Sequence, residues 1–219
     1  MSGMEIEPDT VPVKTVERLV LYRNLLEELR AREKTHIFSS EVAELFGNTP
    51  AQVRRDLMVV GYTGNSRKGY CIDDLLKAIR SLLEPAGGIT MVVAGVGNLG
   101  RALLGYFALL QPRFRIVAAF DNDPNKVNRT IAGFRIHDIA AVATALANQP
   151  AQLGIITVPA DQAQKAADIL VMAGVRGVVN FTSVPLRVPR GVWLENVQIT
   201  STLEKVAYFS RMKQVGGEA

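Results

Sequence analysis

The chain has 219 residues, of which 48% are hydrophobic and 21% charged, with a net charge of +4; this composition permits one large core or two smaller ones and excludes a disordered chain. No apolar run approaches the ~18 residues of a membrane span, the acidic start MSGMEIEPDT is not a signal peptide, and the single Cys71 excludes a disulfide framework, so we expect a cytoplasmic protein with no membrane partner. Two histidines and one cysteine are too few for a closed zinc site, so no metal is expected. Residues 1–85 hold 12 Lys and Arg against 13 Asp and Glu, so charge alone does not indicate a nucleic-acid binder.

The first 84 residues predict a run of helices interrupted by a hairpin. Apolar residues at helical spacing favour a helix over residues 14–33. Ser39 or Ser40 can cap a short second helix over residues 41–46, which Gly47 ends. After a third helix, glycines punctuate a hairpin that ends at Tyr70-Cys71-Ile72, and Asp73 caps a helix over residues 74–83. Three helices and a hairpin are typical of a winged helix-turn-helix domain, which we place at residues 1–84, with a linker at residues 85–88.

The third helix carries the candidate DNA contacts. Thr49-Pro50-Ala51-Gln52 predicts its start, with Thr49 as N-cap, Pro50 at the first helical position and Gln52 closing a capping box, and the helix runs to about Val60. Gln52, Arg54 and Arg55 lie off its apolar stripe and can reach phosphates or base edges. Arg67-Lys68 at the hairpin tip suits a backbone or minor-groove contact, although for that pair taken alone a solvated basic turn is the favoured interpretation. A helix-turn-helix can also dock proteins.

Beyond the linker, strands and helices alternate. Strands are expected over residues 89–94, 115–120, 153–158 and 175–180, and helices over residues 99–110, 138–148 and 161–173, with His137 in a turn. This βαβ order predicts an α/β domain, residues 89–199, with a Rossmann-like doubly wound parallel sheet covered on both faces. A last helix over residues 201–212 begins with a capping box formed by Ser201 and Glu204, and we assign residues 200–219 to dimerisation because that helix is apolar on more than one face.

Gly95-Val96-Gly97-Asn98-Leu99-Gly100 matches the G-x-G-x-x-G pattern of dinucleotide-binding loops. The match follows an apolar strand, opens a helix, and precedes Asp121 at the end of the next predicted strand. Gly95 permits the tight turn, Gly97 lets a pyrophosphate approach, and Gly100 lets the helix pack against the strand. A glycine-rich turn without a ligand is the less favoured alternative.

Asp121 can accept hydrogen bonds from both hydroxyls of a ribose, and the residues after it, Asn122 and Asp123, supply no cation for a 2′-phosphate. We therefore expect NAD(H) rather than NADP(H). An alternative is that Asp121 is an N-cap or turn carboxylate of the segment Asp121 to Pro124, and it can fill both roles. Thr157-Val158-Pro159 and Asn180-Phe181 end later strands at the same sheet edge and are expected to line the nicotinamide. An apolar pocket favours the neutral reduced ring; Phe181 fits that role, and a core position explains it nearly as well.

No catalytic residues are expected. The Tyr-x-x-x-Lys pair of short-chain dehydrogenases is absent, because Met212 stands four residues after Tyr208, and no Ser/His/Asp or Cys/His set is visible. Two alternatives stay open: an NAD-dependent oxidoreductase with an appended helical domain, and a module that binds CoA or another nucleotide.

Over residues 12–212 the chain resembles the Rex family of redox-sensing transcriptional repressors. The resemblance rests on Arg18-Leu19, Tyr22, Ser39-Ser40-Glu41, Val53-Arg54-Arg55-Asp56, Gly61, Gly64, Gly69-Tyr70, Gly95 to Gly100, Tyr106, Phe120-Asp121, Thr157 to Ala160 and Gly177 to Phe181. It implies a homodimer, with the C-terminal helix swapped into the partner subunit, that binds palindromic double-stranded operator DNA and leaves it when NADH binds as the NADH/NAD⁺ ratio rises. It also adds Ser39 and Ser40 to the candidate DNA contacts.

The chain departs from the family at several positions. Leu57-Met58-Val59 stands where the family usually has Phe-Ser-Tyr, and Ser66-Arg67 replaces Arg-Gly in the wing. Most members use an Arg in helix one and an Asp early in the C-terminal segment as a charged switch; this chain has Asn24 and Gln198 there, but keeps the tyrosine near the nicotinamide as Tyr106. We therefore expect NADH to weaken DNA binding less steeply than a charged switch would.

Overall fold

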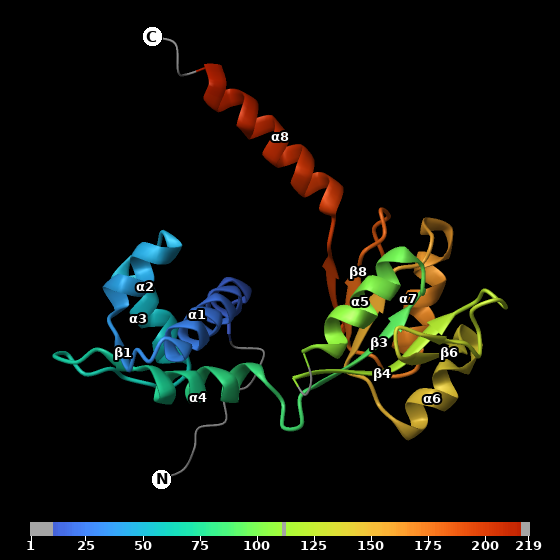
Figure 1. The fold of residues 1–219 in the computed structure, drawn as a ribbon, viewed down its shortest axis with the longest axis horizontal. Helices are drawn as coiled ribbons and strands as arrows, with labels where there is room; N and C mark the ends of the chain where they lie inside the picture. Colours follow the sequence, from blue (N-terminus) through green and yellow to red (C-terminus); the bar gives the residue numbers. More distant parts are fainter. Residues whose placement is uncertain (1–10, 111–112, 216–219) are drawn as a thin grey trace. The chain divides into compact units, whose positions relative to one another are not determined.

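The computed structural model describes residues 11–110 and 113–215, with side chains as far as Arg211. The chain divides into two compact units, residues 1–86 and residues 87–219 (Figure 1). The first unit contains α1 (Val13–Ala31), β1 (His36–Ile37), α2 (Ser39–Phe46), α3 (Pro50–Val59), β2 (Tyr70–Cys71) and α4 (Ile72–Leu83). Strands β1 and β2 pair antiparallel, and the residues between α3 and β2 form the wing.

The core of the first unit forms where the apolar stripes of its helices meet. Leu19 and Leu26 of α1, Val53 and Leu57 of α3, and Ile79 of α4 are all fully buried in one cluster. The expected inward stripe of the third helix is therefore confirmed, and Arg54, Arg55 and Met58 of α3 are exposed. This packing fixes which side chains of α3 are available to a partner.

The helix ends of the first unit confirm some of the predicted caps and contradict others. Thr49 is the N-cap of α3, since its hydroxyl accepts a hydrogen bond from the Gln52 backbone N–H at 3.2 Å, and Gly47 ends α2 at φ +63°. The serine cap of α2 is wrong: the helix begins at Ser39, because the Glu41 carboxylate accepts from the Phe38 N–H at 2.7 Å. Asp73 is likewise inside α4, whose first residue, Ile72, is buried in the core.

The second unit is built on a seven-stranded sheet in the order β5-β6-β4-β3-β7-β8-β9. Its strands are β3 (Ile89–Ala94), β4 (Phe114–Asp121), β5 (Thr130–Ile131), β6 (Phe134–Asp138), β7 (Leu153–Ile156), β8 (Gly177–Asn180) and β9 (Trp193–Asn196). All neighbours are parallel except β5 and β6. Helix α5 (Asn98–Ala108) packs on one face, and α6 (Val142–Asn148) and α7 (Ala163–Met172) pack on the other. The doubly wound parallel sheet is confirmed.

Three strands of the second unit, β5, β6 and β9, were not foreseen. β6 pairs with β4, so His137 lies in a strand and not in the expected turn. Only Ile136 of β6 is fully buried, and polar residues flank it, so the segment lacks the apolar run of an interior strand. β9 lies at the opposite edge of the sheet and is mostly exposed, which gives its sequence no strong period either.

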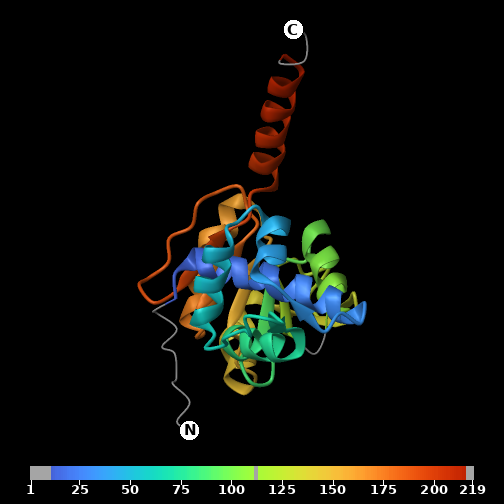
Figure 2. The same ribbon diagram turned by 90° about the vertical axis from the view of Figure 1, so that its left-hand side faces the viewer.

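The last helix, α8, spans Ile199–Val215. The capping box predicted for it is wrong: Ser201 lies inside the helix, and its hydroxyl donates to Gln198 Oε1 at 2.9 Å. Every side chain of residues 199–211 is exposed, including Leu203, Val206 and Phe209, and Figures 1 and 2 draw α8 away from the sheet of its own unit. The side chain of Met212, the next apolar residue of the helix, lies outside the described residues. Among the described residues, no helix is both long and apolar enough to cross a membrane.

Candidate functional site

The glycine loop connects β3 to α5. Gly95 has φ +94°, and a Cβ there would lie 2.7 Å from the Thr157 carbonyl carbon; a Cβ on Gly100 would overlap the Gly95 carbonyl oxygen. Packing therefore requires both glycines. A Cβ on Gly97 would meet nothing within 4 Å, so this glycine leaves open space directly in front of the first turn of α5. Free backbone N–H groups in that turn make the space suitable for an anion.

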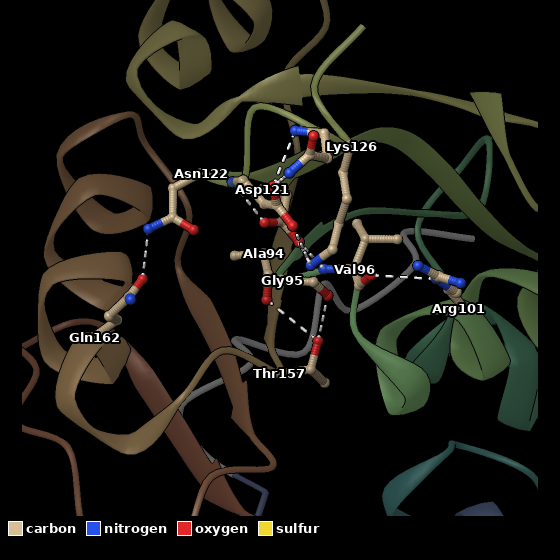
Figure 3. A network of polar contacts seen from close by, with 11 residues as sticks. Ala94, Gly95, Val96, Arg101, Asp121, Asn122, Lys126, Thr157 and Gln162 are labelled. Carbon is tan, nitrogen blue, oxygen red and sulfur yellow. Dashed lines mark hydrogen bonds and ion pairs between the residues drawn. The ribbon is translucent and has the colours of Figure 1, made fainter. Parts of the chain in front are cut away.

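Asp121 closes the loop from the end of β4 (Figure 3). Its Oδ2 accepts from the Val96 backbone N–H at 2.7 Å and from Lys126 Nζ at 3.0 Å, and its Oδ1 accepts from the Asp123 N–H at 2.9 Å. Burial, at 6% exposure, would raise the pKa of Asp121, but the bonds from Asp123, Val96 and Lys126 together lower it below its usual value. The group is therefore an anion at neutral pH, and Oδ1 keeps acceptor capacity for a further donor.

A cation does lie beside Asp121, five residues further along the chain. Lys126 Nζ lies 3.0 Å from Asp121 Oδ2 and 3.7 Å from Asp123 Oδ2. This cation was not expected from Asn122 and Asp123, the two residues that follow Asp121; a lysine within one turn of an acidic strand end is the signal that could have found it. Because two carboxylates share one ammonium group, the cluster keeps a net negative charge.

Thr157 braces the loop from the neighbouring strand end. Its hydroxyl donates to the Gly95 carbonyl at 2.7 Å and lies 3.2 Å from the Ala94 carbonyl (Figure 3). The hydroxyl is thus engaged with the main chain of the glycine loop. We assign it a positioning role for that loop.

These elements border a cleft of about 580 Å³, a volume that suits an organic ligand. It brings together Gly95, Gly97, Asp121, Asn122, Thr157, Val158 and Pro159, all singled out from the sequence. It adds Phe120, Asp123, Lys126, Ile139, Gln162, Lys165, Ala166 and Ile169. Asn98, Leu99, Tyr106, Asn180 and Phe181 are not among its lining residues, so this unit forms the side next to Asp121 more completely than the side next to α5.

Of the residues expected around the nicotinamide, Asn180, Phe181 and Tyr106 have other partners or are open to solvent. Asn180 is fully buried; its Nδ2 donates to the Val184 carbonyl and to Asn196 Oδ1, each at 2.8 Å, and its Oδ1 accepts from Thr182. Phe181 is half-buried against the core beneath α5. Tyr106 is 58% exposed and packs edge-on against Phe107, with ring centroids 5.3 Å apart. Asn180 therefore holds its own loop together.

In the first unit a buried carboxylate anchors α3. Asp56 Oδ2 accepts from Arg18 Nε at 2.6 Å and from Tyr22 Oη at 3.1 Å, and Oδ1 accepts from Arg18 Nη2 at 2.7 Å and Gln52 Nε2 at 2.9 Å. Burial would raise the pKa of Asp56, but the hydrogen bonds from Arg18 and Gln52 lower it below its usual value. Burial, together with Asp56, raises the pKa of Tyr22 to about 12. Arg18 thereby ties α3 to α1.

This network sets the orientation of the candidate DNA contacts. Gln52 does not close a capping box: its amide donates to Asp56, and its Oε1 accepts from Arg55 Nη2 at 3.2 Å. Arg54 donates to Ser39 Oγ at 3.3 Å, while Arg54, Arg55 and Ser40 are exposed. In the wing, Asn65 Oδ1 accepts from the backbone N–H groups of Arg67 and Lys68 at 2.8 and 3.2 Å, leaving both side chains exposed. Four exposed cations thus lie on α3 and the wing of one unit.

The three expected switch positions have local partners. Asn24 Oδ1 accepts from Arg23 Nη2 at 3.2 Å within α1. Gln198 accepts from Ser201 and Thr202 at the start of α8. Within residues 11–110 and 113–215, no group of three or more His, Cys, Asp or Glu side chains is placed to hold a metal ion.

Comparison with known proteins finds a family model that matches part of each unit. A family model described as "CoA binding domain" matches residues 89–184, and one described as "Putative DNA-binding protein N-terminus" matches residues 10–57. "Redox-sensing transcriptional repressor Rex" of Brevibacillus brevis is 35% identical over 194 residues, covering 89% of this chain and 94% of the relative. The protein of the same name from Halalkalibacterium halodurans is 36% identical over 94% of this chain and 97% of its own length.

The chain belongs to the Rex family. Solved structures agree: the Rex-family repressor RSP in complex with β-NAD⁺ and operator DNA is 31% identical, with a TM-score of 0.85, over 95% of this chain and 98% of its own. RSP in complex with β-NADH gives a TM-score of 0.83 at 30% identity, over 94% of this chain and 97% of its own. Rex proteins are transcriptional repressors and not enzymes, so the expected family and function class are confirmed.

Proposed function

We propose that this Rex-family chain is a redox-sensing repressor that binds operator DNA through its first unit, binds NAD(H) in the cleft of its second unit, and releases DNA when NADH binds. The observation that carries the proposal is the joint geometry of the glycine loop and Asp121: open space at Gly97, in front of the first turn of α5, beside an ionised carboxylate held by Val96. A pyrophosphate fits the first, and a ribose hydroxyl can donate to the second. Its single cysteine suits the reducing cytoplasm, where we place it.

Selectivity for NAD(H) over NADP(H) follows from the charge of the Asp121 cluster. A 2′-phosphate would meet two carboxylates and one lysine that both of them already contact. The net repulsion disfavours NADPH even though Lys126 is present. Replacing Asp121 with Ala removes a charged acceptor and should weaken NADH binding by about 1–3 kcal/mol, which equilibrium titration by nicotinamide fluorescence measures. Equal wild-type affinity for NADH and NADPH would contradict this role of Asp121.

For the DNA complex, we propose that two copies of α3 read a palindromic operator. Arg55 is aligned by Gln52 and Arg54 by Ser39, so these arginines are the proposed base-edge or phosphate contacts, with Gln52, Ser39 and Ser40 supporting them. Arg67 and Lys68 are proposed phosphate contacts from the wing. Losing either wing cation should weaken binding to all sequences alike and reduce its salt dependence.

The two copies come from a homodimer, in which we propose that α8 swaps into the partner subunit. All its side chains up to Arg211 are exposed, and Leu203, Val206 and Phe209 give it an apolar surface that the rest of its own unit leaves uncovered. A second copy of the chain would cover that surface. It would also bring further residues to the nicotinamide side of the cleft, which this unit leaves open near Tyr106.

The switch is proposed to operate without an ion pair between positions 24 and 198. A hydrogen bond between neutral amides contributes only about 1 kcal/mol. Apolar closure around the reduced ring, with Phe181 and Tyr106, therefore supplies most of the preference of NADH for the DNA-free form. A roughly 100-fold preference of NADH for the DNA-free form corresponds to about 2.7 kcal/mol. We expect this chain to respond less steeply than that, and the pair Asn24→Arg with Gln198→Asp to sharpen the response.

A single assay tests the proposal. An operator is obtained by random-site selection with the full chain, and its binding is followed by fluorescence anisotropy during titration with NADH, NAD⁺ and NADPH. We expect NADH to release the DNA at lower concentration than NAD⁺, and NADPH to be much weaker. If saturating NADH leaves operator affinity unchanged, or no sequence is selected, the proposed function is wrong. The match to a model described as "CoA binding domain" favours CoA as a second candidate ligand, so CoA forms a further arm of the titration.

A further inference from the structure

The outward face of α3 carries one large apolar side chain between its cations. The inward face is marked by the buried residues of the helix, Val53, Asp56 and Leu57. On the opposite side Met58 is 69% exposed, and Arg54 and Arg55 are exposed with it. A helix turns by about 100° per residue, so Met58 lies between the two arginines, about 40° around the axis from Arg54 and about 60° from Arg55. The face available to a partner therefore presents a thioether flanked by two guanidinium groups.

Helix geometry also places Met58 beside the arginines along the axis. It follows Arg55 by three residues and Arg54 by four, the spacings at which side chains are neighbours on a helix surface. The rise over three to four residues is about 4.5–6 Å, and long helical side chains lean back toward the N-terminus. Base pairs are about 3.4 Å apart. Where the arginines reach base edges, the Met58 thioether therefore lies within about one to two base pairs of them.

The chemistry of this side chain suits one group in the major groove, where a recognition helix lies. Met58 has no N–H or O–H donor, and its sulfur is a weak acceptor, so it does not read bases by hydrogen bonds. It is flexible, polarisable and apolar. Among the four bases, thymine alone presents an apolar group in that groove, its 5-methyl, which apolar side chains contact. Covering Met58 with this methyl group removes apolar surface of both from water.

We propose that Met58 is a specificity-determining residue that reads the 5-methyl group of one thymine in each half-site of the operator. This inference rests on the proposed function and deepens it, because it names a base and the residue that selects it. The wing cations Arg67 and Lys68, as phosphate contacts, position the helix without reading sequence. Met58 therefore adds a preference that the cations do not supply.

The test removes the methyl group from the DNA. An operator is obtained by random-site selection with the full chain, and each thymine is replaced in turn, in both half-sites, by uracil, which pairs in the same way and lacks only the 5-methyl group. Fluorescence anisotropy without NADH gives the loss of affinity on each replacement for the wild type, Met58→Ala and Met58→Leu. Leu45→Ala is the matched control, since Leu45 is 60% exposed and lies on α2.

Burial of one methyl group contributes about 0.8 kcal/mol, which is about fourfold in affinity for one half-site and about 15-fold for both. We therefore expect one thymine at which uracil weakens wild-type binding by about 15-fold. Met58→Ala should reduce that loss to less than about threefold, while Met58→Leu keeps most of it and Leu45→Ala keeps all of it. A second random-site selection, with Met58→Ala, should lose the preference for thymine at that position alone.

The inference is wrong if, at every thymine, the loss caused by uracil in Met58→Ala stays within about threefold of the wild-type loss. It is equally wrong if Leu45→Ala abolishes the loss as Met58→Ala does, or if the second selection recovers the same thymines. Each of these results leaves operator binding and its release by NADH intact. Failure of the first selection to yield any operator would instead refute the proposed function.

Discussion

Substitution of Asp56 with Asn tests how strongly the first unit depends on one buried carboxylate. Asp56 accepts two hydrogen bonds from Arg18, one from Tyr22 and one from Gln52, and it is itself almost fully buried. Asn keeps the shape but loses the charge and turns one acceptor into a donor, which then faces Arg18 or Tyr22. The substitution therefore leaves the Arg18 guanidinium without its counter-ion.

The loss in the free energy of unfolding depends on how well water can solvate the Arg18 guanidinium once its counter-ion is gone. Removing one partner of a fully buried ion pair costs about 3–5 kcal/mol, because the other charge is left unpaired. The Arg18 side chain keeps 22% exposure, so solvent recovers part of that loss and the lower end applies. We expect Asp56→Asn to lower the free energy of unfolding of the first unit by about 3 kcal/mol. With a urea slope of about 1–3 kcal/mol per molar, the midpoint falls by about 1–3 M.

Urea unfolding of the full chain measures the effect. Far-UV circular dichroism follows the helices of both units, and fluorescence of the single tryptophan, Trp193 in β9, follows the second unit alone. The matched control is Asp73→Asn, since Asp73 is 74% exposed and lies 3.8 Å from Arg30 in the same unit. We expect the control to change nothing measurable. If Asp56→Asn shifts the first-unit transition no more than Asp73→Asn does, the Asp56 network does not anchor α3.

Three further predictions concern pH, the glycine loop and the last helix. Because the pKa of Asp56 is lowered in the folded protein, its carboxylate stabilises the first unit above the ordinary carboxyl pKa. This stability should be lost as the pH falls below about 4, and acid titration of Asp56→Asn should no longer show that loss. Gly100→Ala places a Cβ on the Gly95 carbonyl oxygen, so we expect loss of NADH binding in a fluorescence titration while operator binding by the first unit persists; undiminished NADH affinity would show that the loop can move. Deletion of residues 200–219 should convert the dimer into a monomer or an aggregate in analytical ultracentrifugation, and a stable truncated dimer would place the interface elsewhere.

Local patterns in the sequence identified the features whose causes are local. Thr49 with Pro50 marks the start of α3, because an N-cap needs only a hydroxyl within reach of an N–H three residues away. The apolar run of β3, the following glycines and Asp121 at the end of β4 predicted the cleft, because the ends of parallel strands meet at one sheet edge. The family resemblance extended this to a complete function.

Contacts between distant segments decided the rest. The expected cap at Asp73 was displaced because Ile72 is buried in the core, and the polar strand β6 formed because β4 had a free edge. The cap at Ser39 was missed for a local reason, because Glu41 accepts from the Phe38 N–H three residues away.

The sequence alone determined the order of the long helices and of strands β3, β4, β7 and β8, the glycine loop and the identity of the acidic residue beside it, since periodicity and backbone conformation act over a few residues. Only the tertiary structure decided what each side chain does there. It paired Asn180 with Asn196, joined Arg18 to Asp56, and brought Asn122 to Gln162 across a separation of 40 residues. Hydrogen bonds of this kind depend on where distant residues lie in space, and packing of the helices and strands sets those positions. The pattern of residues along the chain does not show which distant residues will meet.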